Sequence, residues 1–181
     1  EIKERFELEE LNVGILKLTS QEWRNIEWIH QLTIIAPPKP LSDGALLFIT
    51  GGSLKNGEPK WKGKDDGLFK MMASIAAKNN AIVAIVSQVP NQPLFNDLTE
   101  DALISFTLNN FKGDRDFTWP LLFPMTKSAV RAMDAVQQYA NKELKQKNQK
   151  IRRYRGFKTW LDNMAYRITG SPGNSYCTDG Y

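Results

Sequence analysis

Four segments of the chain are predicted to be β-strands. They are Val13–Leu18, Trp28–Ala36, Ala45–Thr50 and Ala81–Val86. The last two are almost wholly apolar, which is typical of strands that are buried on both faces of a parallel sheet. Pro37 and Pro38 close the second segment, because proline cannot donate to a strand ladder. The sequence therefore predicts two strands near the N-terminus, followed by two buried parallel strands.

Apolar residues at helical spacing predict helices between and after the two buried strands. Asp66 is placed to cap a helix that ends near Lys78–Asn80, and a second helix is expected from about Thr126 to Lys147. Thr99 is a candidate cap for a shorter helix, since two carboxylates follow it. The expected apolar stripes are Leu68, Met71, Met72, Ile75 and Ala76 on the first helix and Ala129, Met133, Val136, Ala140 and Leu144 on the second.

The order strand, helix, strand, helix predicts an α/β fold, in which a right-handed crossover joins Ala45–Thr50 to Ala81–Val86. The chain after Ile151 fits this pattern poorly, because it lacks the strand expected after the long helix. The segment Gly170–Tyr181 is rich in turn-forming residues and offers almost no core. We therefore expect one folded domain over residues 1–151.

The composition is that of a globular protein and excludes several kinds of site. Of the 181 residues, 41% are hydrophobic and 24% charged, and no apolar run reaches the ~20 residues that a membrane span needs. The single cysteine, Cys177, excludes an internal disulfide and a cysteine-cluster zinc site. The single histidine, His30, excludes sites that need several imidazoles. No motif for a metal or an organic cofactor is present, so we expect no cofactor.

The net charge of +4 raises the possibility of a nucleic-acid partner. The charge is unevenly distributed, because residues 1–140 carry slightly more acidic than basic side chains, whereas residues 141–181 are strongly basic. The basic run Lys142–Arg155 lacks the interleaved aromatic residues that bind single strands. We interpret this run as a solvated helix end that leads into a loop, and expect no nucleic-acid partner.

One short segment carries candidate chemistry. Gly51, Gly52 and Ser53 directly follow the buried strand Ala45–Thr50. Backbone N–H groups of a glycine-rich loop in this place can bind an oxyanion or a phosphate. The spacing matches neither a P-loop nor a dinucleotide-binding fingerprint, and an ordinary tight turn is the alternative.

Other residue types that often carry chemistry are interpreted as structural. His30 shares a strand face with Trp28 and has no identifiable partner for a ligand or base role, so we expect a hydrogen-bonded structural histidine. Trp23, Trp28 and Trp119 do not form a compact run, so we expect packing residues rather than a stacking platform. Paired aspartates such as Asp65-Asp66 lack the spacing of a calcium-binding loop and suit helix caps and turns.

Five strings of the sequence are together too long and too specific to be explained by chance. They are SQEWRNIEWIHQLTIIAP (Ser20–Pro37), ALLFITGGS (Ala45–Ser53), IVAIVSQVPNQPL (Ile82–Leu94), TEDALISFT (Thr99–Thr107) and WPLLFPMTKSAVRAMDAVQ (Trp119–Gln137). In this order they resemble the PhoPQ-activated pathogenicity-related protein family, whose members include autocrine-proliferation-repressor-like proteins. The resemblance covers about residues 10–151.

The resemblance implies the N-terminal part of an α/β-hydrolase-like sheet, made of two N-terminal strands and a βαβ unit. Gly51, Gly52 and Ser53 then lie where α/β-hydrolases form one half of the oxyanion hole with backbone amides. Intact relatives would be secreted or periplasmic, virulence-associated serine hydrolases of a small ester- or amide-like substrate that is not defined. A secreted signalling or binding protein that uses the scaffold without catalysis is the alternative. Because the chain begins at Glu1, we expect an N-terminal piece to be missing.

The nucleophile turn of the family, a glycine-x-serine-lysine-arginine-glycine string, is absent from the sequence. One choice of codons for Tyr154–Ala165, read one nucleotide later, encodes TGASKRGWTTW, which resembles that turn. We therefore hypothesise a frameshift near Arg152–Tyr154, with residues 152–181 as a non-native tail and no catalytic residue in this chain. The strand Ala45–Thr50 would then keep an open, apolar edge. A divergent C-terminus is the alternative.

Overall fold

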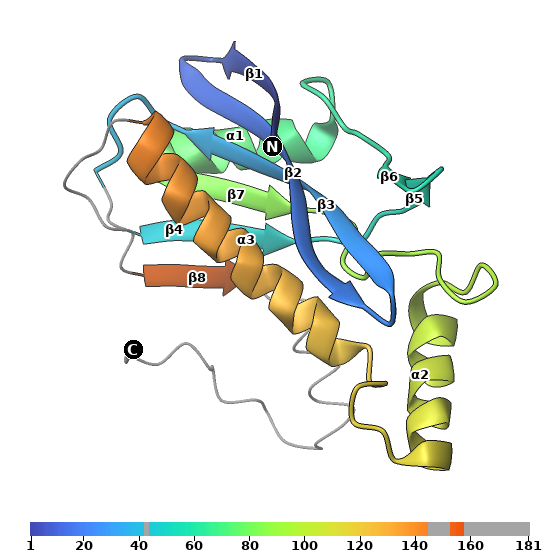
Figure 1. Ribbon diagram of the computed structural model, residues 1–181. Helices are drawn as coiled ribbons and strands as arrows, with labels where there is room; N and C mark the ends of the chain where they lie inside the picture. The colour runs from blue at the N-terminus through green and yellow to red at the C-terminus, as the bar shows by residue number, and fades with distance from the viewer. Residues whose placement is uncertain (42–43, 145–152, 158–181) are drawn as a thin grey trace.

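The computed structural model describes residues 1–41 and 44–144, and the backbone of residues 153–157. The described chain forms a six-stranded sheet in the order β1-β2-β3-β7-β4-β8, with α1 on one face and α3 on the other (Figure 1). The sheet strands are β1 (Ile2–Leu8), β2 (Leu11–Trp23), β3 (Ile26–Ala36), β4 (Gly44–Ile49), β7 (Ile82–Val86) and β8 (Arg153–Phe157). A separate small hairpin and three helices complete the elements: β5 (Leu54–Lys55), β6 (Glu58–Pro59), α1 (Gly67–Asn79), α2 (Glu100–Asp114) and α3 (Leu122–Glu143).

The sheet is mixed. Strands β1, β2 and β3 run antiparallel to one another, and β3 pairs antiparallel with β7. Strands β7, β4 and β8 are mutually parallel, so β4, α1 and β7 form the βαβ unit that the sequence predicts. The α/β class is therefore confirmed.

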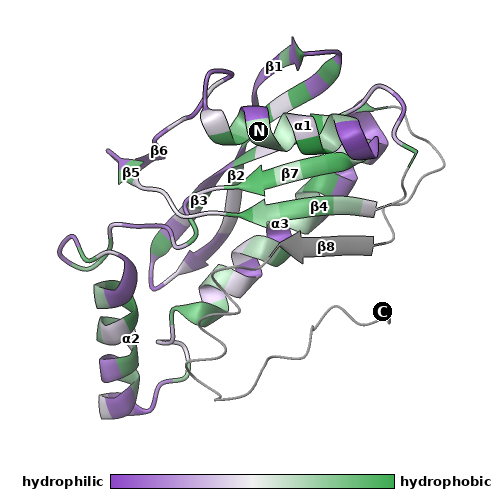
Figure 2. Ribbon diagram, turned by 180° about the vertical axis from the view of Figure 1, so that it is seen from behind, coloured by the Kyte–Doolittle hydropathy of each residue, from purple (hydrophilic) through white to green (hydrophobic). Residues whose placement is uncertain are grey.

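The sheet separates two apolar cores. Under α3, side chains from β3 and β7 such as Ile34 and Val86 pack with Met125 and Val136 of the helix. Under α1, the alternate side chains of the same strands pack against the helix, which contributes Phe69. All five residues of β7 are buried, which confirms the prediction of a strand covered on both faces, and the apolar character of β4 and β7 is visible in Figure 2.

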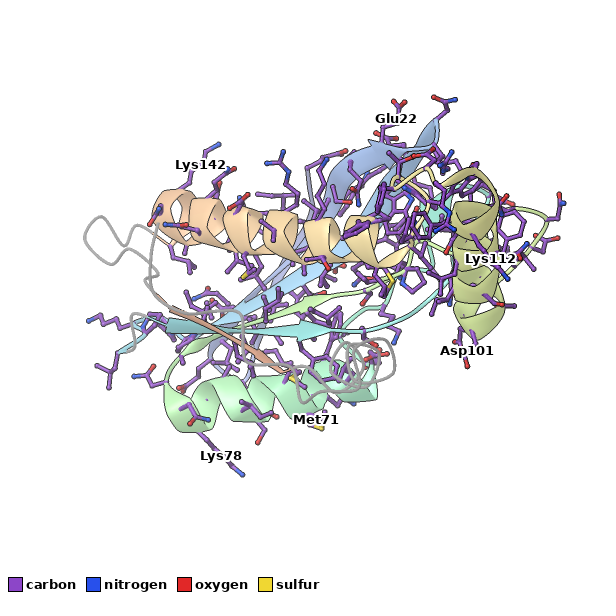
Figure 3. All side chains as sticks on the ribbon, turned by 90° about the horizontal axis from the view of Figure 1, so that it is seen from below. Glu22, Met71, Lys78, Asp101, Lys112 and Lys142 are labelled. Carbon is purple, nitrogen blue, oxygen red and sulfur yellow. The ribbon has the colours of Figure 1, made fainter. Side chains whose placement is uncertain are left out.

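Helix α1 begins where the sequence predicts. The side chain of Asp66 accepts hydrogen bonds from the backbone N–H groups of Leu68 (3.0 Å) and Phe69 (3.3 Å), which satisfies two amides of the first turn. The predicted apolar stripe is wrong at one position, because Met71 is 51% exposed and projects from the outer face of the helix (Figure 3). Phe69, which the stripe omits, is buried in its place.

The two later helices differ from prediction at their N-termini. Helix α3 begins at Leu122 rather than near Thr126, and Pro124 lies in its first turn, where a missing N–H costs no hydrogen bond. Its predicted stripe is buried or partly buried, whereas the predicted end at 147 lies outside the described residues. Helix α2 is longer than expected. Thr99 is its N-cap residue, as predicted, but the Thr99 side chain makes no capping hydrogen bond; the Gln92 side chain accepts from the N–H of Glu100 instead (2.8 Å).

Two predictions about the strands are wrong. Three N-terminal strands form rather than two, because β1 is an edge strand whose charged residues hide the apolar signal. A further strand, β8, pairs in parallel with β4 from Gly44↔Arg153 to Phe48↔Phe157, so the edge of β4 is covered. Strand pairing uses backbone N–H and C=O groups, and every residue type except proline has both. An unpaired strand edge can therefore pair with an extended segment of almost any sequence. Of the predicted tail 152–181, only residues 153–157 lie among the described residues.

No helix in the described parts of the chain has the length and apolar character that crossing a membrane requires.

Candidate functional site

Two described loops begin at the same edge of the sheet. Because β4, β7 and β8 are parallel, their carboxyl ends lie side by side, as the arrowheads in Figure 1 show. The loop that carries Gly51–Ser53 leaves β4 there, and the segment from Ser87 to Pro93 leaves β7. In open α/β sheets, ligands bind at the carboxyl ends of parallel strands.

The Gly51–Ser53 loop lies against the segment after β7. The backbone N–H of Gln88 donates to the carbonyl of Gly51 (3.2 Å), and the N–H of Val89 donates to the carbonyl of Thr50 (3.2 Å). These bonds use the carbonyl groups of the loop and not its amides. Within the described residues, the N–H groups of Gly51, Gly52 and Ser53 donate no hydrogen bond, and both glycines are exposed. The three backbone amides of the loop are therefore unpaired among the described residues.

Gly52 is needed in this loop for two reasons. Its φ is +145°, a conformation that residues with a side chain rarely adopt. A Cβ at this position would lie 3.1 Å from Nε2 and 3.3 Å from the backbone nitrogen of Gln88. The neighbouring Gly51 has open space around its Cβ position, so the constraint is specific to Gly52.

A buried polar network underlies the loop, and the sequence analysis missed it. The N–H of Ser87 donates to the carbonyl of Gln31 (2.9 Å), and the N–H of Gln31 donates to Oε1 of Gln88 (2.9 Å). The side-chain amide of Asn91 donates to the carbonyl of Ile29. These four polar side chains are at most 2% exposed. The only signal in the sequence was a polar string, SQVPNQP, directly after a wholly apolar strand.

His30 is a buried structural histidine, as predicted. Its Nδ1–H donates to the carbonyl of Ser87 (3.1 Å), so Nε2 is the acceptor for the hydroxyl of Ser20 (2.9 Å). That hydroxyl also contacts Ser128 on α3 (3.1 Å). Burial lowers the pKa of His30 from its usual 6.5 to about 4, which keeps the ring neutral at pH 7. Both residues are buried, with Ser20 5% and His30 0% exposed, so the pair is shielded from a substrate in solution.

The β2–β3 turn is clamped to the chain between α2 and α3. The guanidinium of Arg24 lies 3.4 Å over the ring of Trp119 and donates to Asp116 (2.7 Å) and to the hydroxyl of Thr118 (2.9 Å). Bonds from Thr118 and Arg24 lower the pKa of Asp116 to about 2. Trp23 packs edge-on against Trp28 at 5.7 Å, as expected for interior tryptophans, whereas Trp119 stays partly exposed under the arginine. The clamp fixes the start of α3.

In the described ranges, no three His, Cys, Asp or Glu side chains gather closely enough to hold a metal ion, and Cys177 lies outside those ranges.

The sheet, its two covering helices and the loops at the carboxyl edge define a protein of the α/β class. The chain belongs to the PhoPQ-activated pathogenicity-related protein family, whose model matches residues 1–168. This match confirms the resemblance that the five sequence strings indicate.

The chain was also matched with one curated protein and with one solved structure. The chain is 32% identical over 137 residues to autocrine proliferation repressor protein A of Dictyostelium discoideum, a match that covers 69% of this chain and 26% of that protein. The chain thus spans about a quarter of the length of this curated relative. A PEG-bound cold-adapted esterase from an Arctic intertidal metagenomic library superposes with a TM-score of 0.44 at 10% identity, covering 84% of this chain and 52% of the esterase.

Proposed function

We propose that this chain is the N-terminal part of a secreted serine hydrolase with a small ester- or amide-like substrate. The observation that carries the proposal is the set of three backbone amides at Gly51, Gly52 and Ser53. They donate to no group within the described residues, and they lie at the carboxyl edge of parallel strands. Amides held in this way can stabilise the negative charge that develops on a carbonyl oxygen during acyl transfer.

The reaction of the intact protein would proceed through an acyl-enzyme. A serine hydroxyl attacks the carbonyl carbon while a base takes its proton, and the oxygen of the tetrahedral intermediate accepts hydrogen bonds from the loop amides. The leaving group departs with that proton, and water then releases the acid from the serine. Removing one donor of such an oxyanion site typically slows the reaction by ~10²–10³-fold.

The position of β8 supports a nucleophile near this loop in intact relatives. By the family resemblance, β4 corresponds to the third strand of an α/β-hydrolase sheet. In such a sheet the third strand lies next to the fifth, and the attacking serine follows the fifth strand. Strand β8 lies beside β4, and Phe157 is paired with Phe48 in the register of the two strands. Phe48 comes three residues before Gly51. The frameshift hypothesis puts the missing serine codon across Phe157 and Lys158, at the end of this strand.

The chain as it stands is proposed to be inactive. The described histidine and its serine partner are enclosed in the interior, and no other described residue provides an imidazole. The family nucleophile turn is absent from the sequence. The N-terminal part therefore supplies oxyanion donors without an attacking group.

A binding or signalling role without catalysis is the second candidate. It is favoured by the curated relative, which is described as an autocrine proliferation repressor. In that case the loop amides would hold an anionic group of a partner rather than a reaction intermediate.

Labelling with a fluorophosphonate separates these candidates. The probe is applied to the 181-residue chain and to a version in which the codons from Tyr154 are read one nucleotide later and continue along the gene. We expect labelling of the second protein and none of the first. A copy of the second protein with its restored serine codon changed to alanine is the control and should not label. Labelling of the 181-residue chain, or none of the restored protein, would contradict the hydrolase proposal. Codons that do not encode GASKRGW in the shifted frame would refute the frameshift.

A further inference from the structure

Gln88 stands out as a strained and buried polar residue beside the candidate loop. It lies two residues beyond the end of β7, its φ is +60°, and the residue is 1% exposed. A left-handed conformation is costly for a residue with a long side chain and persists only where the surroundings impose it. Such residues cluster at functional sites.

Hydrogen bonding fixes the orientation of the Gln88 side-chain amide. Its Oε1 accepts the backbone N–H of Gln31 at 2.9 Å. A backbone N–H is only a donor, so the group that receives it must be the amide oxygen, and the two ends of the side-chain amide cannot be exchanged. The side-chain NH2 group of Gln88 is therefore held on the side that faces away from the N–H of Gln31.

The NH2 group lies against the Gly51–Ser53 loop. A Cβ on Gly52 would be 3.1 Å from Nε2 of Gln88, so the absence of a side chain there leaves this nitrogen uncovered on the loop side. Within the described residues, Nε2 donates no hydrogen bond. This nitrogen is not completely sealed from solvent, since it is not one of the described buried side-chain atoms that lack a partner. A donor that is fixed and unused, on a residue that is 1% exposed, is suited to bind an acceptor atom that reaches the loop.

We propose that the side-chain amide of Gln88 is a hydrogen-bond donor of the same anion site as the Gly51–Ser53 amides. A carboxylate or oxyanion oxygen bound there accepts bonds from the backbone of the loop and from Nε2 of Gln88. The donor is a neutral dipole, fixed before the ligand arrives, which is the arrangement that stabilises developing negative charge best. The inference rests on the proposed anion-binding role of the loop and names a residue outside it.

This assignment also explains the glycine at position 52. The first reason for Gly52 is its backbone conformation, and the second is that a methyl group would cover the Gln88 donor. Gln31 is a positioning residue. Its backbone N–H holds the side-chain oxygen of Gln88, so Gln31 acts on the site through Gln88.

The test is an NMR titration of the 181-residue chain labelled with ¹⁵N, in which acetate replaces chloride at constant ionic strength. We expect the backbone amides of Gly51–Ser53 and the side-chain NH2 of Gln88 to shift along one binding curve. The variant Gln88→Glu keeps an acceptor for Gln31 but replaces the donor with a carboxylate oxygen, and should weaken acetate binding at least tenfold. Gln92→Glu is the matched control, because Gln92 likewise accepts a backbone N–H, from Glu100, and should bind acetate within twofold of the native chain.

The outcomes separate this inference from the function on which it rests. If the loop amides shift while the Gln88 NH2 signals do not, and Gln88→Glu binds normally, Gln88 is not a donor and the anion site of the loop stands. If neither group shifts, the anion site is absent and both proposals fail. Should Gln88→Glu lose its dispersed spectrum, the joint shift of the two groups in the native chain decides, together with Gly52→Ala, which should abolish the Gln88 shift.

Discussion

Nδ1 of His30 donates a hydrogen bond to the carbonyl oxygen of Ser87 at 3.1 Å, which ties the middle of the sheet to the segment that supports the candidate loop. In the neutral ring, the other nitrogen, Nε2, accepts from the hydroxyl of Ser20. A proton on His30 would reverse the direction of the bond to Ser20 and place a charge in the interior. Burial of this ring therefore makes its protonation costly in the folded protein.

Stability should fall as the pH is lowered from about 7 to about 5. The pKa of His30 is 6.5 when exposed and about 4 in the folded protein, so the unfolded chain binds a proton in this range and the folded protein does not. The loss attributable to this residue is about 2 kcal/mol between these two pH values. Urea unfolding at several pH values measures it, and a His30→Gln variant should show a dependence that is weaker by that amount. Equal slopes in the two proteins would contradict the buried neutral histidine.

The two glycines of the loop should respond differently to alanine. Gly52→Ala forces a side chain into a φ of +145° and against Gln88, so we expect a loss of about 1–3 kcal/mol in the free energy of unfolding. Gly51→Ala meets nothing within 4 Å and should change that free energy by about 0.5 kcal/mol or less. Chemical denaturation of both variants makes the comparison. Equal losses would mean that the backbone constraint is not at Gly52.

The cap of α1 can be tested with neighbouring aspartates. Asp66→Ala removes two hydrogen bonds to the first turn and should destabilise the protein by about 1 kcal/mol. Asp66→Asn keeps an acceptor and should recover most of this loss. Asp65→Ala, at an exposed residue beside it, is the control and is expected to have a small effect. A larger loss for Asp65→Ala than for Asp66→Ala would refute the capping role.

Strand β8 should protect the sheet edge. A chain that ends at residue 152 lacks the partner of β4 and leaves its backbone groups unpaired, which favours association with other chains. A chain that ends at residue 157 retains the whole of β8 and is the control. Light scattering against concentration should show association of the shorter chain at lower concentrations. The same behaviour for both chains would contradict the pairing of β8 with β4.

Sequence and structure agree best where the signal is local. The buried strand β7 was predicted within one residue, because an apolar run that fills both faces of a sheet needs no knowledge of its neighbours. Likewise, Asp66 caps α1 through bonds that span two and three residues. Met71 shows the limit of this approach, since its spacing fits the apolar stripe while the sheet faces the other side of the helix.

By itself, the sequence determined the α/β class, the βαβ unit, the position of the Gly51–Ser53 loop and, through five strings, the family. Those features follow from patterns within one segment at a time. Only the tertiary structure decided that β8 covers β4, that His30 is enclosed, and that Gln88 holds its amide beside Gly52. These relationships join residues that are tens of positions apart, and their distances depend on how the strands pair and pack. No local pattern encodes them, so the donors of the candidate site are assembled by the fold.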